Sequence, residues 1–213
     1  MTIKAHILSV AAVSMLTCAA AQAQDNVFKL GAIRYTTNSC TSGIKGPGVP
    51  AGADAETGDA TTVILVYERT LTPNLGIELV VGIPPRIKSR AIGSVAFLGD
   101  NVLSAKNVAP TLLMNYYFGD ASSTIRPYVG VGLNYTKFAS VKSSLAPKVE
   151  MSDSLGAAIQ AGVNYAITKQ YGLFASVARV DVKSDLVAVG STVLTTSIDF
   201  KPVTYSLGGW YRF

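Results

Sequence analysis

Long segments in which apolar side chains alternate with polar or small ones constrain the fold of this chain more than any other feature. In IRPYVGVGLNYTKF (125–138), alternate positions from Pro127 to Tyr135 are mostly apolar, and the residues between them are polar or glycine. The same alternation recurs at 154–165 and 203–213. A period of two residues is typical of a β-strand whose two faces meet different surroundings. The sequence therefore predicts an all-β fold.

The length of these strands and the scarcity of charge indicate a membrane barrel. Charged residues make up only 15% of the chain, and no later stretch of about 20 apolar residues could cross a bilayer as a helix. Strands of about ten residues that alternate apolar with polar or glycine are typical of transmembrane barrels, whose apolar face contacts lipid. A closed barrel also leaves no backbone group unpaired in hydrocarbon. A soluble β-sandwich, the alternative, would use shorter strands and turn its apolar faces inward.

The first 23 residues have the pattern of a cleaved secretory signal peptide. Lys4 and His6 give a basic start, 7–16 is an apolar run too short to span a bilayer, and Ala21-Gln22-Ala23 is an A-x-A-type cleavage site. A buried N-terminal helix is the alternative. The expected organisation is a signal peptide over 1–23 and one outer-membrane β-barrel over 24–213. The barrel region keeps one cysteine and no histidine, so no internal disulfide is expected.

The alternation and the turn residues predict eight antiparallel strands, at 26–36, 60–70, 75–83, 106–118, 125–138, 153–166, 171–183 and 198–213. Their connections are short and long in turn, the long ones being 37–59, 84–105, 139–152 and 184–197. Such barrels place short turns in the periplasm and long loops outside, which predicts both termini on the periplasmic side. Aromatic residues near strand ends, among them Tyr67, Tyr116, Tyr165 and Tyr171, fit an interfacial girdle. Tyr211 and Phe213 are further expected to form the assembly signal that the barrel-assembly machinery reads.

Eight strands enclose a space that side chains nearly fill, so a wide aqueous pore is not expected. Alternation places a group of polar and aromatic residues inward in the periplasmic half: Lys29, Glu68, Glu78, Arg126, Tyr128, Asn164, Trp210 and Arg212. Opposite charges in a low-dielectric interior are expected to pair and to close the lower barrel as a polar plug. A polar core that only stabilises the barrel is the alternative.

Four segments resemble the OmpW family of outer-membrane proteins. They are PTLLMNYYFGDASSTIRPYVGVGLNYTKF (110–138), TPNLGIELVVGIP (72–84), DSLGAAIQAGVNY (153–165) and GWYRF (209–213). The resemblance implies an eight-stranded barrel with a narrow, mostly apolar lumen and a role in the uptake of small hydrophobic compounds, as in the alkane-associated branch of the family. Relatives can carry an aromatic residue at the position of Ala178, whereas the sole tryptophan here is Trp210.

The outer half of the lumen is expected to be an apolar funnel lined by Ile64, Val66, Val80, Thr111, Leu113, Ala158, Ala178 and Val180. An apolar funnel above a polar plug suits a small hydrophobic solute that leaves sideways into the membrane. The alternative is that these residues only pack against one another.

Other functions receive less support from the sequence. Barrel enzymes use histidine as a base, and the expected mature chain contains no histidine, no catalytic constellation and no metal-binding cluster. Neither a cofactor nor a nucleic-acid partner is expected, because the basic residues form no patch or stripe. The alternative function is a structural or surface-interaction barrel: an adhesin, or a phage or bacteriocin receptor. Basic residues near the outer rim, such as Arg86, Lys88 and Lys106, are expected either to contact lipopolysaccharide phosphates or simply to be solvated.

Overall fold

The computed structural model describes residues 26–37, 40–41, 43–100, 102–144, 146, 148–189 and 193–213. The predicted signal peptide, 1–23, lies outside these residues, so its cleavage stays a prediction. Within the described ranges, no helix is both long and apolar enough to cross a membrane.

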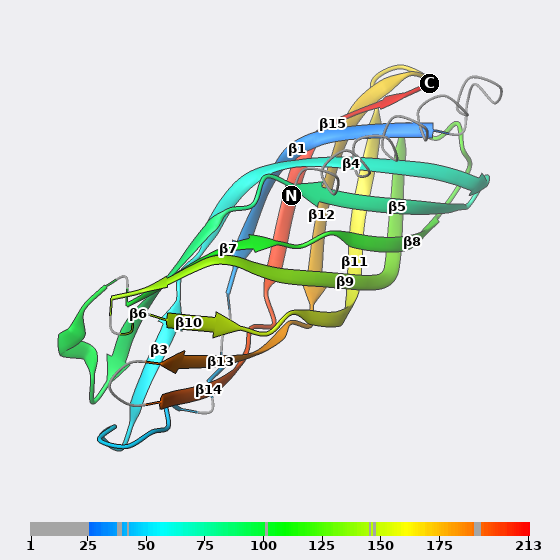
Figure 1. Cartoon of the computed structure of the whole chain (residues 1–213). Helices are drawn as coiled ribbons and strands as arrows, with labels where there is room; N and C mark the ends of the chain where they lie inside the picture. The colour runs from blue at the N-terminus through cyan, green and yellow to red at the C-terminus, as the bar shows by residue number, and fades with distance from the viewer. Residues whose placement is uncertain are drawn as a thin grey trace, which may run out of the picture.

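Eight antiparallel strands close into a barrel (Figure 1). In chain order they are β1 (Asn26–Thr36), β4 (Ala60–Thr72), β5 (Leu75–Gly82), β8 (Thr111–Tyr117), β9 (Ile125–Ser143), β11 (Ser154–Ala166), β12 (Tyr171–Val180) and β15 (Val203–Arg212). Each strand pairs with the next, and β15 pairs with β1 from Val27↔Arg212 to Thr36↔Val203. The closure leaves the barrel without a free edge, which is the condition for strands to stand in hydrocarbon. The predicted eight-stranded antiparallel barrel is confirmed.

The two ends of the barrel differ, and we name them by their connections. At the turn end, Thr72 Oγ1 accepts hydrogen bonds from the backbone N–H groups of Asn74 (3.3 Å) and Leu75 (3.0 Å), which fixes the β4–β5 turn. The described chain also begins and finishes there, since the Phe213 N–H donates to the Asn26 carbonyl at 3.0 Å. The opposite end, where the long connections lie, is the loop end.

The long connections contain strands that the sequence did not predict. They are β2 (Cys40–Thr41), β3 (Ala53–Thr57), β6 (Arg86–Gly93), β7 (Leu103–Val108), β10 (Lys148–Met151), β13 (Lys183–Val189) and β14 (Val193–Asp199), with a short 3-10 helix, η2 (Ala96–Leu98). Figure 1 shows β3, β6, β10, β13 and β14 gathered at the loop end. β7, β6 and β3 continue the barrel sheet from β9, whereas β10, β13, β14 and β2 form a separate four-stranded sheet.

Four predicted strand limits were wrong, and prolines account for two of them. The strand predicted at 106–118 is interrupted at Ala109-Pro110, because proline has no N–H to donate to a ladder. The last strand starts at Val203, directly after Pro202, rather than at 198. By contrast, β9 runs on to Ser143 because its outer part pairs with β7. The strand predicted at 171–183 ends at Val180, and Lys183 begins β13 of the separate sheet.

The outward face of the barrel is an apolar belt. Leu30, Leu133, Leu155 and Leu207 are more than half exposed there, as lipid-facing side chains must be in a structure without lipid. At the turn end an aromatic cluster borders the belt, and the ring centroid of Phe28 lies 5.3 Å from that of Phe213 and 5.4 Å from that of Tyr67. Tyr211 and Phe213 belong to this edge; their role in assembly stays a prediction.

This placement of the belt can be tested with two exposed apolar residues. Val131, near the middle of the barrel part of β9, is 63% exposed, and Phe97, in η2 at the loop end, is 81% exposed. Val131→Arg is expected to lower the free energy of unfolding in lipid vesicles by about 2–4 kcal/mol, because an arginine would meet hydrocarbon. Phe97→Arg should change it by less than about 0.5 kcal/mol. Equal effects of the two substitutions in denaturant titrations would place the belt elsewhere.

Candidate functional site

The loop-end half of the barrel encloses a narrow cavity of about 90 Å³. The residues predicted to form the apolar funnel all border it: Ile64, Val66, Val80, Thr111, Leu113, Ala158, Ala178 and Val180. They come from β4, β5, β8, β11 and β12, and each lies on the inward face because side chains alternate along a strand. Their role in passing a solute stays a prediction.

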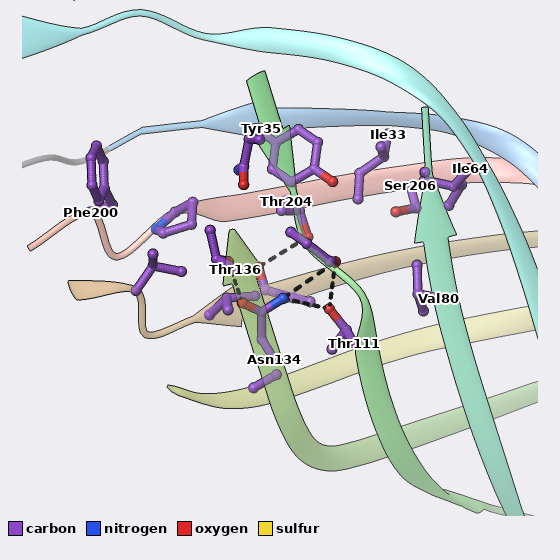
Figure 2. A pocket seen from close by; sticks show the side chains of 18 of the residues that line it. Ile33, Tyr35, Ile64, Val80, Thr111, Asn134, Thr136, Phe200, Thr204 and Ser206 are labelled. Carbon is purple, nitrogen blue, oxygen red and sulfur yellow. Dashed lines mark hydrogen bonds between the residues drawn. The ribbon is translucent and has the colours of Figure 1, made fainter. Parts of the chain in front are cut away.

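The cavity also has polar side chains that were not in the predicted lining. Asn134 and Thr136 on β9 are buried, and Figure 2 shows them beside Thr111. The Asn134 amide donates to Thr111 Oγ1 at 2.8 Å, and the Thr136 hydroxyl donates to Asn134 Oδ1 at 2.6 Å. These groups form hydrogen bonds with one another, so they leave few unpaired donors or acceptors facing the cavity. Alternation had placed both residues inward, but nothing in the sequence marked them as lining this cavity.

Below this cavity lies a buried ion-pair layer centred on Lys29. Its Nζ is 2.6 Å from Glu78 Oε2 and 2.8 Å from Glu68 Oε2, and the side chain is 1% exposed. Glu68 and Glu78 stand directly opposite each other on β4 and β5, where two like charges would repel. Lys29, on the neighbouring β1, balances both carboxylates. These contacts are of the kind expected for opposite charges in the lower lumen, and the role of the layer as a plug stays a prediction.

Further side chains extend the ion-pair layer across the barrel. The Gln160 amide donates to Glu78 Oε1 at 3.0 Å and to Asn115 Oδ1 at 2.7 Å. The rings of Tyr128 and Phe174 lie 5.2 Å and 5.6 Å from Lys29 Nζ. Gln160, Asn115 and Phe174 were not among the predicted plug residues, although alternation had already placed Gln160 inward.

The remaining predicted plug residues border a second cavity, of about 1010 Å³, at the turn end. They are Glu68, Arg126, Asn164, Trp210 and Arg212. Neither arginine forms an ion pair with any residue that the structure describes, so the expected pairing of opposite charges does not extend to them. Arg126 instead donates to the Pro73 carbonyl. The physical reason is that Lys29 already engages both carboxylates of the layer.

Two glycines create the room that these side chains need. A Cβ at Gly162 would lie 2.5 Å from the Tyr128 ring, and one at Gly172 would lie 2.6 Å from the Trp210 ring. Glycine on these strands therefore allows an aromatic ring from a neighbouring strand to lie flat over the backbone.

The described residues contain no group of three or more histidine, cysteine, aspartate or glutamate side chains arranged to hold a metal ion. The carboxylates of Glu68 and Glu78 are engaged by Lys29. The expectation that the protein uses no cofactor stays a prediction.

A closed eight-stranded barrel with an apolar outward belt and a lumen crossed by buried side chains defines the class of small outer-membrane β-barrels. The chain belongs to the OmpW family, whose family model matches residues 22–213. Outer membrane protein W of Escherichia coli K12 is 33% identical over 162 residues, which cover 72% of this chain and 73% of that protein. Outer membrane protein AlkL of Ectopseudomonas oleovorans is 27% identical over 169 residues, covering 79% and 73%. The protein is therefore an outer-membrane protein.

Solved structures agree with this assignment. The crystal structure of the outer membrane protein OprG from Pseudomonas aeruginosa is similar with a TM-score of 0.82 at 25% identity, over 90% of this chain and 97% of that one. The solution structure of E. coli outer membrane protein W gives 0.60 at 27% identity, over 91% and 100%. The resemblance predicted from the sequence is confirmed.

The glycine contacts give a stability test with an internal control. Gly162→Ala is expected to lower the free energy of unfolding by about 1–3 kcal/mol, because its Cβ would overpack against the Tyr128 ring. Gly209→Ala is the control, since its Cβ would meet its nearest neighbour, the Gly172 carbonyl oxygen, at 3.6 Å. Denaturant titration of both variants in detergent micelles measures the difference. Equal stability of the two would contradict the packing of Tyr128 over Gly162.

Proposed function

We propose that this protein is a passive outer-membrane channel for small hydrophobic molecules, not an enzyme. The observation that carries the proposal is the loop-end cavity, whose wall joins apolar side chains to polar ones that hydrogen-bond mainly to each other. A solute entering it would gain apolar contact without leaving many buried polar groups unpaired. Membership of the OmpW family supports the same function.

The ion-pair layer makes a straight route through the barrel unfavourable. Lys29, Glu78, Tyr128 and Phe174 border the lower part of the loop-end cavity and are all buried. Pushing an apolar solute past Lys29 would separate buried charges, which costs several kcal/mol. An apolar solute is therefore expected to leave the cavity sideways, with the loop end outside the cell and the turn end in the periplasm.

The barrel wall has a suitable break between β5 and β8. Its ladder stops at Val80↔Thr111 and resumes where the Asn107 N–H donates to the Pro85 carbonyl at 3.1 Å. Between these points lie Pro84 and Pro110, which have no N–H to donate. The inner side of this break borders the cavity through Gly82 and Ala109, and Ile83 beside it is exposed on the belt. We propose this wall break as the sideways route from the cavity to lipid.

Uptake by reconstituted protein tests the channel. Val80→Asp adds a charge to the cavity wall beside the break and is expected to lower the entry of octane or naphthalene into proteoliposomes at least tenfold. Val80→Thr, which keeps the volume and adds no charge, should retain most of it. Heat-modifiable migration on gels shows that each variant is folded. Wild-type protein that gives no more entry than empty liposomes would refute the channel and favour the structural or surface-interaction barrel.

Basic residues above the belt support lipopolysaccharide as a partner. Arg86, Lys88 and Lys106 are exposed on β6 and β7, and Arg86 stands directly opposite Lys106. None of the three forms an ion pair with a described residue, although like charges in opposite positions are destabilising. Phosphate groups of the outer leaflet would remove this repulsion.

Thermal unfolding tests this partner. Purified lipopolysaccharide is expected to raise the melting temperature of the wild type, because a ligand that binds only the folded state stabilises it. The rise in melting temperature should be smaller for the double variant Lys88→Gln/Lys106→Gln. For Lys169→Gln, at the turn end, it should equal that of the wild type. An equal rise in all three proteins would argue against these residues as the contact.

A further inference from the structure

The charged side chains of the lower barrel do not balance. Lys29, Arg126, Glu68 and Glu78 are buried and Arg212 is half-buried. Together they carry three positive charges and two negative ones, so one positive charge is left over. Lys29 lies within 2.8 Å of both carboxylates. The excess therefore rests on the two arginines, and an uncompensated charge in a low-dielectric interior is costly.

Both arginines keep unused donors inside the turn-end cavity. Arg126 is 8% exposed, and the Nε atoms of Arg126 and Arg212 are buried without a hydrogen-bond partner among the described residues. The Arg126 guanidinium carbon lies 5.0 Å from the centroid of the Tyr117 ring, and that of Arg212 lies 5.5 Å from the Trp210 ring. Each planar group is thus held over an aromatic ring, with part of its fork free.

Among the residues that the structure describes, no acidic side chain forms an ion pair with either arginine. Asp120, in the β8–β9 turn, is exposed and forms no ion pair within the described residues. Arg126 and Arg212 border the same cavity, and their like charges disfavour each other there. An anion between them would relieve that repulsion and neutralise the single excess charge.

We infer that the turn-end cavity holds a binding site for a small oxyanion, a carboxylate or a phosphate, formed by Arg126 and Arg212. Guanidinium forks match the geometry of carboxylate and phosphate groups, to which they can donate two parallel hydrogen bonds. The cavity, about 1010 Å³, is large enough for such a group together with its attached molecule. This site lies on the far side of the ion-pair layer from the proposed hydrophobic route, so it is independent of the channel.

Trp210 provides a direct signal for this site. It is the only tryptophan of the chain and lies beside Arg212, so its fluorescence reports on the cavity. We would titrate the folded protein in detergent micelles with sodium phosphate or sodium acetate, using sodium chloride to keep the ionic strength constant. The expected result is a saturable change in Trp210 emission with at least one of the two anions, and the arm that saturates at lower concentration identifies the preferred oxyanion.

Matched variants separate binding from charge screening. Arg126→Gln and Arg212→Gln are each expected to weaken anion binding, which raises the half-saturation concentration at least tenfold. Arg69→Gln is the control, because Arg69 is exposed on β4 near the same end of the barrel and does not border the cavity. Arg126→Lys and Arg212→Lys keep the positive charge but remove the forked guanidinium group. Weaker anion binding in these two variants supports the site even where a glutamine variant fails to fold. A linear response with both anions, or unchanged saturation in the arginine variants, would overturn the proposal.

Discussion

Pairing of every backbone group across the membrane is the constraint on which this structure depends. An edge strand in hydrocarbon would leave N–H and C=O groups unpaired, so β15 returns to β1 and the Phe213 N–H reaches the Asn26 carbonyl. Once the sheet is closed, the period of two decides which residues meet lipid and which enter the lumen. The belt, the cavities and the ion-pair layer all follow from that division.

The ion-pair layer divides the lumen into two compartments of different chemistry. Lys29 separates a narrow, mostly apolar cavity at the loop end from a wider cavity at the turn end that is lined by arginines. Two opposed glutamates on neighbouring strands are unfavourable unless a cation lies between them, and a lysine from a third strand supplies it. The layer therefore also specifies how β1, β4 and β5 align, because a shift by one residue would turn these charges toward lipid.

Much of this arrangement could be predicted from the sequence, because alternation carries the information. It predicted the eight-stranded antiparallel barrel, and it led to the expectation that opposite charges in the lower lumen would pair. It could not predict the strands at the loop end, because β3, β6 and β13 lie beyond the belt and their segments were interpreted as loops. It also could not show that Arg126 and Arg212 remain without acidic partners, since which cation reaches a carboxylate first depends on three-dimensional distance rather than on spacing along the chain.

The wall break has a mechanical consequence. Elsewhere in the barrel, parting two strands would require backbone hydrogen bonds to be broken in hydrocarbon, where no water can replace them. At Pro84 and Pro110 there are no N–H groups to form such bonds, so a side-chain movement at this seam breaks no ladder hydrogen bond of these two residues. Rotamer changes of exposed side chains take picoseconds to nanoseconds. A closed, rigid sheet can thus contain a seam at which side chains change rotamer while the hydrogen-bond ladder of the rest of the barrel stays intact.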